Sequence, residues 1–321
     1  MNQNLIRAAT SAAALLIIPS LASAEVRVVA SVKPIHSLVA SIMQGAGEPA
    51  LIVGGAASPH TYSLKPSDAQ KLEDADVVFW IGHEFEAFLD KPLEALPGDA
   101  KVVALSDAPG LVELPFREGG PFEAHDDGDH EDHAGEAGSE TAHHDEHGHG
   151  GTDMHLWLDP MNAKAMASQI RDTLVAADPA NAEIYRKNTE TLDNQLDALD
   201  KEIAAAVDPV KDKPFVVFHD AYQYFENRYH VRVAGSVTVS PETMPGAERL
   251  SAIHAKIGEL GAACVFAEPQ FEPKLLNVVT EGTTARSGVL DPEGGALTEG
   301  PALYADLLRA MATSLVECLS K

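Results

Sequence analysis

Cysteine, aromatic residues and positive charge are all scarce in this sequence. Two cysteines among 321 residues are too few for a disulfide scaffold or for a zinc site built from thiolates. Aromatic residues make up 6% of the chain, so stacking against carbohydrate or nucleobases is not an obvious theme. The 23 Lys and Arg stand against 49 Asp and Glu, a formal net charge of −26. That charge argues against nucleic acid or an anionic membrane as a partner and favours a cationic ligand.

Common catalytic motifs are missing as well. No P-loop, G-x-S-x-G or G-x-G-x-x-G motif stands in a suitable context. His83-Glu84 could open an H-E-x-x-H metalloprotease motif, but Ala87 stands where the second histidine is required. Hydrophobic residues are nevertheless 45% of the chain, which is enough to bury real cores. The length fits two compact α/β domains or one large one.

The first 24 residues have the pattern of a secretory signal. Arg7 precedes an apolar run, Ala12–Pro19, and Ala22-Ser23-Ala24 follows as an A-x-A cleavage site. The run is much shorter than the roughly 20 apolar residues of a membrane-spanning helix. We therefore expect export to the periplasm with cleavage after Ala24. In that oxidising compartment Cys264 and Cys318 are expected to form a disulfide.

Residues 119–153 differ sharply in composition from the rest of the chain. They contain eleven Asp or Glu, eight Gly and no Lys or Arg. The same residues hold seven histidines: His125, His130, His133, His143, His144, His147 and His149. Such a segment cannot bury a core, so it predicts a disordered insertion. A solvated acidic insertion would not need histidine, and we expect weak zinc binding at several sites.

Outside the insertion, apolar strands alternate with helical patterns. Strands are expected at Val26–Val32, Leu51–Val53, Val77–Gly82 and Lys101–Leu105, and again at Phe215–Phe218, Val231–Val239, Cys264–Ala267 and Val289–Leu290. Helices are expected at Pro66–Asp74, Phe85–Leu96, Asn162–Ala177, Ala221–Tyr229, Ala247–Leu260, Pro273–Arg286 and Pro301–Leu319. Continuous apolar strands separated by helices are typical of parallel sheets covered on both faces. The pattern predicts an α/β fold with two lobes, residues 25–177 and 208–321.

One long helix is expected between the lobes. Over residues 178–207, Leu192, Leu196, Leu199 and Ile203 recur at helical spacing. A helix of this length reaches about 42 Å and can cross a whole protein. We expect a stiff connection that limits hinge motion of the lobes.

Four potential ligands follow predicted strands or stand near the insertion. His60 follows Leu51–Val53, His155 comes at the end of the insertion, His219 ends Phe215–Phe218, and Asp291 follows Val289–Leu290. Ligands in parallel α/β sheets sit beyond the carboxyl ends of the strands, so two side chains from each lobe should converge. Three neutral imidazoles with a carboxylate or a water make a tetrahedral zinc site. His36, His230 and His254 are interpreted as non-ligands.

Four motifs around these residues resemble a known family. They are SPHTYSLKPSD at Ser58–Asp68, HLWLDP at His155–Pro160, FHDAY at Phe218–Tyr222 and FAEPQ at Phe266–Gln270. They are similar to motifs of the metal-binding proteins of zinc and manganese ABC importers, over essentially the whole mature chain. The resemblance implies two α/β lobes bridged by one long helix, with the metal between them.

The resemblance also assigns the ligands. His60, His155 and His219 match the three histidine ligands of the family. Manganese-preferring relatives usually carry a carboxylate where His219 stands, which favours zinc here. Some zinc-binding members have a glutamate just before the first ligand, where this chain has Pro59. The fourth ligand therefore stays open between Asp291 and water.

The implied function is capture of Zn²⁺ in the periplasm and delivery to an ABC permease. The partners would be zinc, the permease with its ATPase subunit, and a periplasmic zinc chaperone, with the protein itself a monomer and not an enzyme. Two alternatives stay open at this stage. A zinc hydrolase would need a general base such as Asp220, Glu268 or Asp291. A passive zinc buffer would rely mainly on the insertion.

Overall fold

The computed structural model describes residues 26–96, 98, 100–117, 122, 151–238, 246–270 and 278–320. The expected signal sequence and the seven histidines of the insertion lie outside these residues. Residues 151–153 are described, and Thr152 forms an isolated antiparallel bridge with Pro115. The last three residues of the predicted insertion, 151–153, therefore belong to the described fold.

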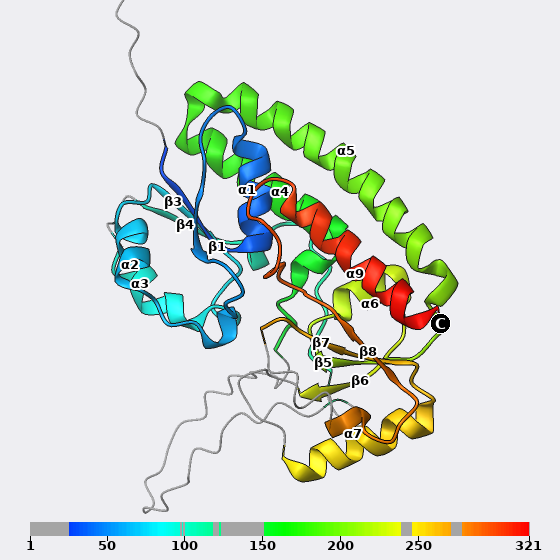
Figure 1. Ribbon diagram of the computed structural model, residues 1–321. Coiled ribbons are helices and arrows are strands. Elements are labelled where there is room, and N and C mark those ends of the chain that lie inside the picture. The colour runs from blue at the N-terminus through cyan, green and yellow to red at the C-terminus, as the bar shows by residue number, and fades with distance from the viewer. Residues whose placement is uncertain are drawn as a thin grey trace, which may run out of the picture.

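Two four-stranded parallel sheets form the two lobes (Figure 1). The first has the order β2-β1-β3-β4, built from β1 (Val28–Val32), β2 (Ala50–Val53), β3 (Val77–Trp80) and β4 (Lys101–Ala104). The second has the order β6-β5-β7-β8, built from β5 (Phe215–His219), β6 (Val233–Thr238), β7 (Cys264–Ala267) and β8 (Arg286–Val289). The two sheets thus repeat one topology, and the predicted α/β fold with two lobes is confirmed.

Helices cover the sheets and join them. They are α1 (Lys33–Met43), α2 (Pro66–Glu73), α3 (Asp90–Glu94), α4 (Pro160–Ala177), α5 (Ala182–Val207), α6 (Gln223–Tyr229), α7 (Ala247–Leu260) and α9 (Leu303–Leu319). Among the described helices, none combines the length and the apolar character needed to cross a membrane.

Two helix predictions need correction, and one helix was not predicted. The expected helix Phe85–Leu96 is a 3-10 turn, Ala87–Leu89, followed by the short α3. At Glu86 the backbone leaves the helical region, with φ −123° and ψ 50°, and the carboxylate accepts the backbone N–H groups of Ile81 and Gly82. The expected helix Pro273–Arg286 lies partly outside the described residues, and it cannot reach its predicted end because Arg286 begins β8. Helix α1 has no counterpart among the predicted helices.

The long helix α5 spans 26 residues, Ala182–Val207, after a 3-10 turn at Pro179–Asn181. It runs along one side of the molecule past both sheets, with α9 beside it (Figure 1). Its buried face includes Leu192, Leu196, Leu199 and Ile203, as the leucine spacing predicts. A helix of this length measures about 39 Å, so α5 connects the two lobes without a flexible linker.

The main hydrophobic core is continuous between the lobes. One cluster of buried side chains includes Val77 and Trp157 on one side and Phe215, Cys264 and Leu308 on the other. A second, smaller cluster lies between β5, β6, β7 and α7.

Polar contacts fix the turn after β8 to the amino-terminal lobe. The Lys33 ammonium donates to the carbonyl oxygens of Gly294, Gly295 and Leu297, at 3.0 to 3.2 Å. The Trp157 indole donates to the carbonyl oxygen of Pro292 at 2.8 Å. Both contacts hold the two lobes in one arrangement.

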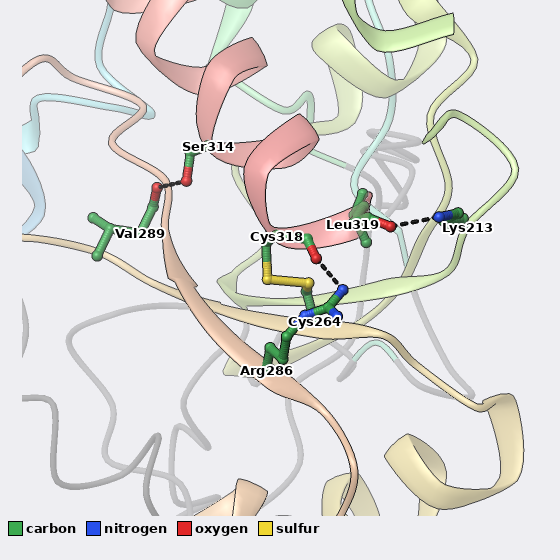
Figure 2. The surroundings of a disulfide bond; sticks show 7 residues. All are labelled: Lys213, Cys264, Arg286, Val289, Ser314, Cys318 and Leu319. Carbon is green, nitrogen blue, oxygen red and sulfur yellow. Dashed lines mark hydrogen bonds between the residues drawn. A yellow bond between two sulfur atoms is a disulfide. The ribbon is translucent and has the colours of Figure 1, made fainter. Parts of the chain in front are cut away.

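The predicted disulfide between Cys264 and Cys318 is present (Figure 2). It ties the start of β7 to the last turn of α9, across a sequence separation of 54 residues. The same end of α9 receives hydrogen bonds from Arg286 to the Cys318 carbonyl and from Lys213 to the Leu319 carbonyl (Figure 2). The bond and these contacts anchor α9 against the second sheet.

Candidate metal centre

Three histidines meet between the carboxyl ends of strands from the two sheets. His60 lies in the 3-10 turn Pro59–Thr61 after β2, His155 directly precedes the 3-10 turn Leu156–Leu158, and His219 is the last residue of β5. One ring nitrogen from each lies within 4.8 Å of the other two. The Nε2 atoms of His155 and His219 are 3.3 Å apart. In the part of the chain that the structure describes, no other three His, Cys, Asp or Glu side chains gather so closely.

Two buried carboxylates orient two of the imidazoles. The Asp153 Oδ1 atom accepts from the His155 backbone N–H at 3.0 Å and lies 2.7 Å from Nδ1. The Glu268 oxygens lie 2.7 and 2.8 Å from Nδ1 of His219. An Nδ1–H that donates to a carboxylate leaves Nε2 as the metal-binding atom, and it raises the basicity of the ligand. In that tautomer, Nε2 of each of the two imidazoles is the atom that could bind a metal.

Burial sets the protonation of the group. It lowers the pKa of His60 and of His155 well below the usual range, and the neighbouring imidazoles add to the effect. Burial also lowers the pKa of His219, but the charge and hydrogen bond of Glu268 outweigh it, so that this pKa is raised. Burial raises the pKa of Asp153 to about 7. Neutral imidazoles are the form that binds zinc, so His60 and His155 are ready to act as ligands at neutral pH.

Two aromatic side chains pack against the group of three histidines. The Phe85 ring packs edge-on against His60 at 5.0 Å and against His155 at 5.4 Å, measured between ring centroids. Trp157 lies 5.4 Å from His155 and 5.2 Å from Phe85. Apolar rings around a metal site restrict solvent access and strengthen the electrostatic interactions of the ion.

Asp291 lies outside the group of three histidines. Its Oδ1 atom accepts from the Gln270 side chain and from the Glu293 backbone, each at 3.2 Å. Its Oδ2 atom accepts from the Ala296 backbone at 3.2 Å. The strand-end position of Asp291 is as predicted, but the carboxylate is used to form the turn after β8.

The histidines interpreted as non-ligands lie elsewhere in the fold. His36 is buried in α1, where Nε2 lies 3.0 Å from the Pro49 carbonyl oxygen. His254 lies 2.8 Å from the Glu281 carbonyl oxygen. His83 lies 2.6 Å from the Asp90 carboxylate, and His230 ends α6 in the left-handed region at a φ of 55°. None of them belongs to the group of three histidines.

Asp153 was not predicted to contact the site, and Glu268 was named only as a candidate general base. Asp153 was counted with the acidic insertion, although it stands two residues before His155. That short Asp-x-His spacing is the signal that could have identified it. Glu268 follows β7, which pairs in parallel with β5, so it lies at the same sheet edge as His219. Its place after a predicted parallel strand is the signal that the sequence offered.

Comparison with known proteins agrees with this geometry. The family model described as ZnuA, zinc-uptake complex component A, periplasmic, matches residues 28–318. The high-affinity zinc uptake system protein ZnuA of Brucella suis biovar 1 is 56% identical over 316 residues, covering 94% of each chain. Its namesake from Yersinia pestis is 39% identical, covering 98% of each chain.

A solved structure shows the same fold. The periplasmic zinc-binding protein TroA of Treponema pallidum superposes with a TM-score of 0.73 at 20% identity, covering 92% of this chain and all of that one (100%). With a family model matching nearly the whole length and relatives of high identity, the chain belongs to the ZnuA family of periplasmic zinc-uptake components.

Proposed function

We propose that this protein captures Zn²⁺ in the periplasm and delivers it to the permease of an ABC importer. The observation that carries the proposal is the convergence of His60, His155 and His219 from both lobes on one point. Nitrogen ligands of this kind suit zinc in preference to the hard cations Ca²⁺ and Mg²⁺. Membership of the ZnuA family supports the same function.

We propose that the three histidines supply three ligands and that a water supplies the fourth. Asp291 is the alternative fourth ligand, but its carboxylate already accepts three hydrogen bonds that form the turn after β8. A site with three protein ligands and one water keeps an exchangeable position. Such a position suits an ion that must be handed on.

A transport component fits the site better than a zinc hydrolase does. A hydrolase needs a free general base beside the metal-bound water. Glu268 is engaged with Nδ1 of His219, Asp220 pairs with Arg117, and Asp291 is held by its own turn. Each carboxylate considered as a base therefore has another role. ATP would be hydrolysed by the ATPase subunit of the importer.

We further propose export through cleavage of residues 1–24, a monomeric state, and zinc exchange with a periplasmic zinc chaperone. The histidines at 125, 130, 133, 143, 144, 147 and 149 would form additional, weaker zinc sites. Export is supported by the sequence pattern at Ala22-Ser23-Ala24.

A growth experiment tests transport. Deletion of the gene should prevent growth in medium depleted of zinc by a chelator, and added zinc should restore it. A plasmid carrying the wild-type gene should rescue growth, whereas His60→Ala should not. Growth of the deletion strain at wild-type rate in depleted medium would contradict the import function, and a hydrolytic activity lost with the gene would favour the enzyme.

Glu268→Gln should weaken zinc binding by roughly ten- to a hundredfold. The amide keeps the size of the side chain but loses the charge that makes Nδ1–H of His219 a strong donor, and outer carboxylates of this kind typically contribute that much affinity. Competition with a chromogenic chelator measures the change. Glu202→Gln is the matched control, since Glu202 pairs with Arg309 on an exposed surface. Equal affinities of the two variants would show that Glu268 does not tune the ligand.

Deletion of residues 120–150 should leave one tight zinc site and remove the weaker ones. The three histidines of the site lie outside this range, and residues 115 and 152 already form a bridge that can hold the shortened chain. Titration calorimetry should show a stoichiometry that falls to one. In the full chain, the weaker sites should empty as the pH falls through about 6.5, the ordinary pKa of histidine, because protonated imidazole cannot bind metal. Loss of the tight site with an intact circular dichroism spectrum would place the insertion in the primary site.

A further inference from the structure

Arg117 stands at the last described position before the insertion, and it is fixed to the segment that carries His155. Phe116 N–H donates to the Gly151 carbonyl at 3.0 Å, and Asp153 N–H donates to the Leu114 carbonyl at 2.9 Å. These two bonds flank the bridge between Pro115 and Thr152. A short antiparallel pair therefore couples the backbone of Arg117 to the backbone of Asp153 and, two residues later, to His155.

The side chain of Arg117 reaches across to the second lobe. Its Nε atom donates to Oδ2 of Asp220 at 3.0 Å, and its Nη2 atom donates to Oδ1 of the same carboxylate. Its Nη1 atom donates to Glu226 in α6. Asp220 directly follows His219 in the sequence. The guanidinium group therefore links the segment of one metal ligand to the residue beside another ligand.

The surroundings make this ion pair different from an exposed one. The side chains of Arg117 and Asp220 keep 21% and 8% of their accessible surface. The Arg117 charge also acts on Asp153, the carboxylate that orients His155. Bidentate guanidinium–carboxylate pairs fix both distance and angle, and breaking a largely buried pair leaves a charge without its partner.

A second set of contacts joins the same segments as this ion pair. Gln223 donates to the Pro115 carbonyl at 3.0 Å, and the Tyr224 hydroxyl donates to the Asp153 carbonyl at 2.7 Å. Both residues belong to α6, as Glu226 does. The base of the insertion is thus docked on α6, and Arg117 supplies the charged contact that reaches the residue next to His219.

We propose that Arg117 is a positioning residue of the metal centre, which holds His155 and His219 at the separation that zinc requires and thereby slows zinc release. The inference rests on the proposed zinc-binding function. Arg117 does not touch the ion and acts through Asp220 and Asp153.

The test compares Arg117→Gln and Arg117→Lys with the wild-type full chain. Zinc release into excess chelator, followed by stopped flow, should be roughly tenfold faster in Arg117→Gln, as expected for loss of an outer contact of a metal site. Arg117→Lys keeps the charge but loses the forked geometry of the guanidinium group. Its rate of zinc release should therefore lie between those of the wild type and Arg117→Gln. The association rate should stay within about twofold, because the three ligands remain.

Arg309→Gln is the matched control. Arg309 makes a bidentate pair with Glu202 at 2.8 Å for both contacts, on the exposed surface between α9 and α5. Its loss should not change zinc release. The absorption spectrum of the Co²⁺-loaded protein is a second readout, and it should change in Arg117→Gln but not in Arg309→Gln, because it reports the geometry of the ligands.

The possible outcomes separate this inference from the proposed function. If the wild-type protein binds no zinc tightly, the proposed function fails. If the wild type binds zinc tightly while Arg117→Gln releases it at the wild-type rate with an unchanged Co²⁺ spectrum, the positioning role is wrong even if the apo protein melts at a lower temperature. If release is faster and the spectrum changes, Arg117 positions the ligands.

Discussion

Replacement of His60, His155 or His219 by alanine is expected to weaken tight zinc binding by at least a hundredfold in each case. Structural zinc sites with four ligands have apparent binding free energies of about 10–16 kcal/mol, or roughly 3 kcal/mol for each ligand. That amount corresponds to about two orders of magnitude in the dissociation constant. Titration calorimetry with chelator competition measures the loss. Asp291→Ala should cost less, because water is the proposed fourth ligand.

The control for this series is His254→Ala. His254 lies in α7 and contacts the Glu281 carbonyl, away from the group of three histidines. Its replacement removes an imidazole of the same chemistry without changing the metal centre, so tight binding should persist. Wild-type affinity in any one of the three alanine variants would remove that histidine from the ligand set.

Loss of the disulfide is expected to lower the free energy of unfolding by about 4 kcal/mol, on the chain-entropy model for a closed loop of this length. The bond joins positions separated by 54 residues, and it anchors the end of α9 on the second sheet. A double variant, Cys264→Ser with Cys318→Ser, should show the loss in urea unfolding of the apo protein. The reason is the larger conformational freedom of the unfolded chain, which no longer contains the closed loop.

Zinc binding gives the matching readout for the disulfide variant. The three histidines are held by β5, by the turn after β2 and by the segment before α4, so the folded double variant should keep its affinity for zinc. Two free thiols per chain in the denatured, unreduced wild type would contradict the bond itself. A stability equal to that of the wild type would show that the hydrogen bonds around Cys318 suffice to anchor α9.

Two of the proposed ligands could be predicted because they end or follow strands, whereas His155 is identified by its motif, HLWLDP, at the end of the insertion. His219 ends β5 and His60 follows β2, and the carboxyl ends of parallel strands are where ligands gather. Asp291 satisfies the same rule but turns its carboxylate toward the N–H groups of its own turn. Strand-end position therefore predicts the neighbourhood of a side chain but not which hydrogen-bond donors it will find there.

Other features had no clear local signal. Helix α1 begins at Lys33, directly after β1 ends at Val32, so no turn separates the two patterns. Its buried Ile35, Leu38, Val39 and Ile42 do have helical spacing, but they continue the apolar strand before them. At Glu86 the backbone leaves the helical region and the carboxylate bonds to the N–H groups of Ile81 and Gly82, and a periodic pattern does not contain such contacts.

Because the two lobes share one hydrophobic core, they should unfold together. Side chains of both lobes belong to one cluster, and Lys33 and Trp157 bond across it to the turn after β8. Neither half can lose its packing without exposing apolar surface of the other, so the free energy that resists opening is common to both. An ion bound between the sheets stabilises the native state by RT ln(1 + [Zn²⁺]/Kd), and this gain is distributed over the whole molecule. Zinc would in this way act as a ligand that protects the entire chain from unfolding and from proteolysis, and the zinc-free protein would be degraded more readily.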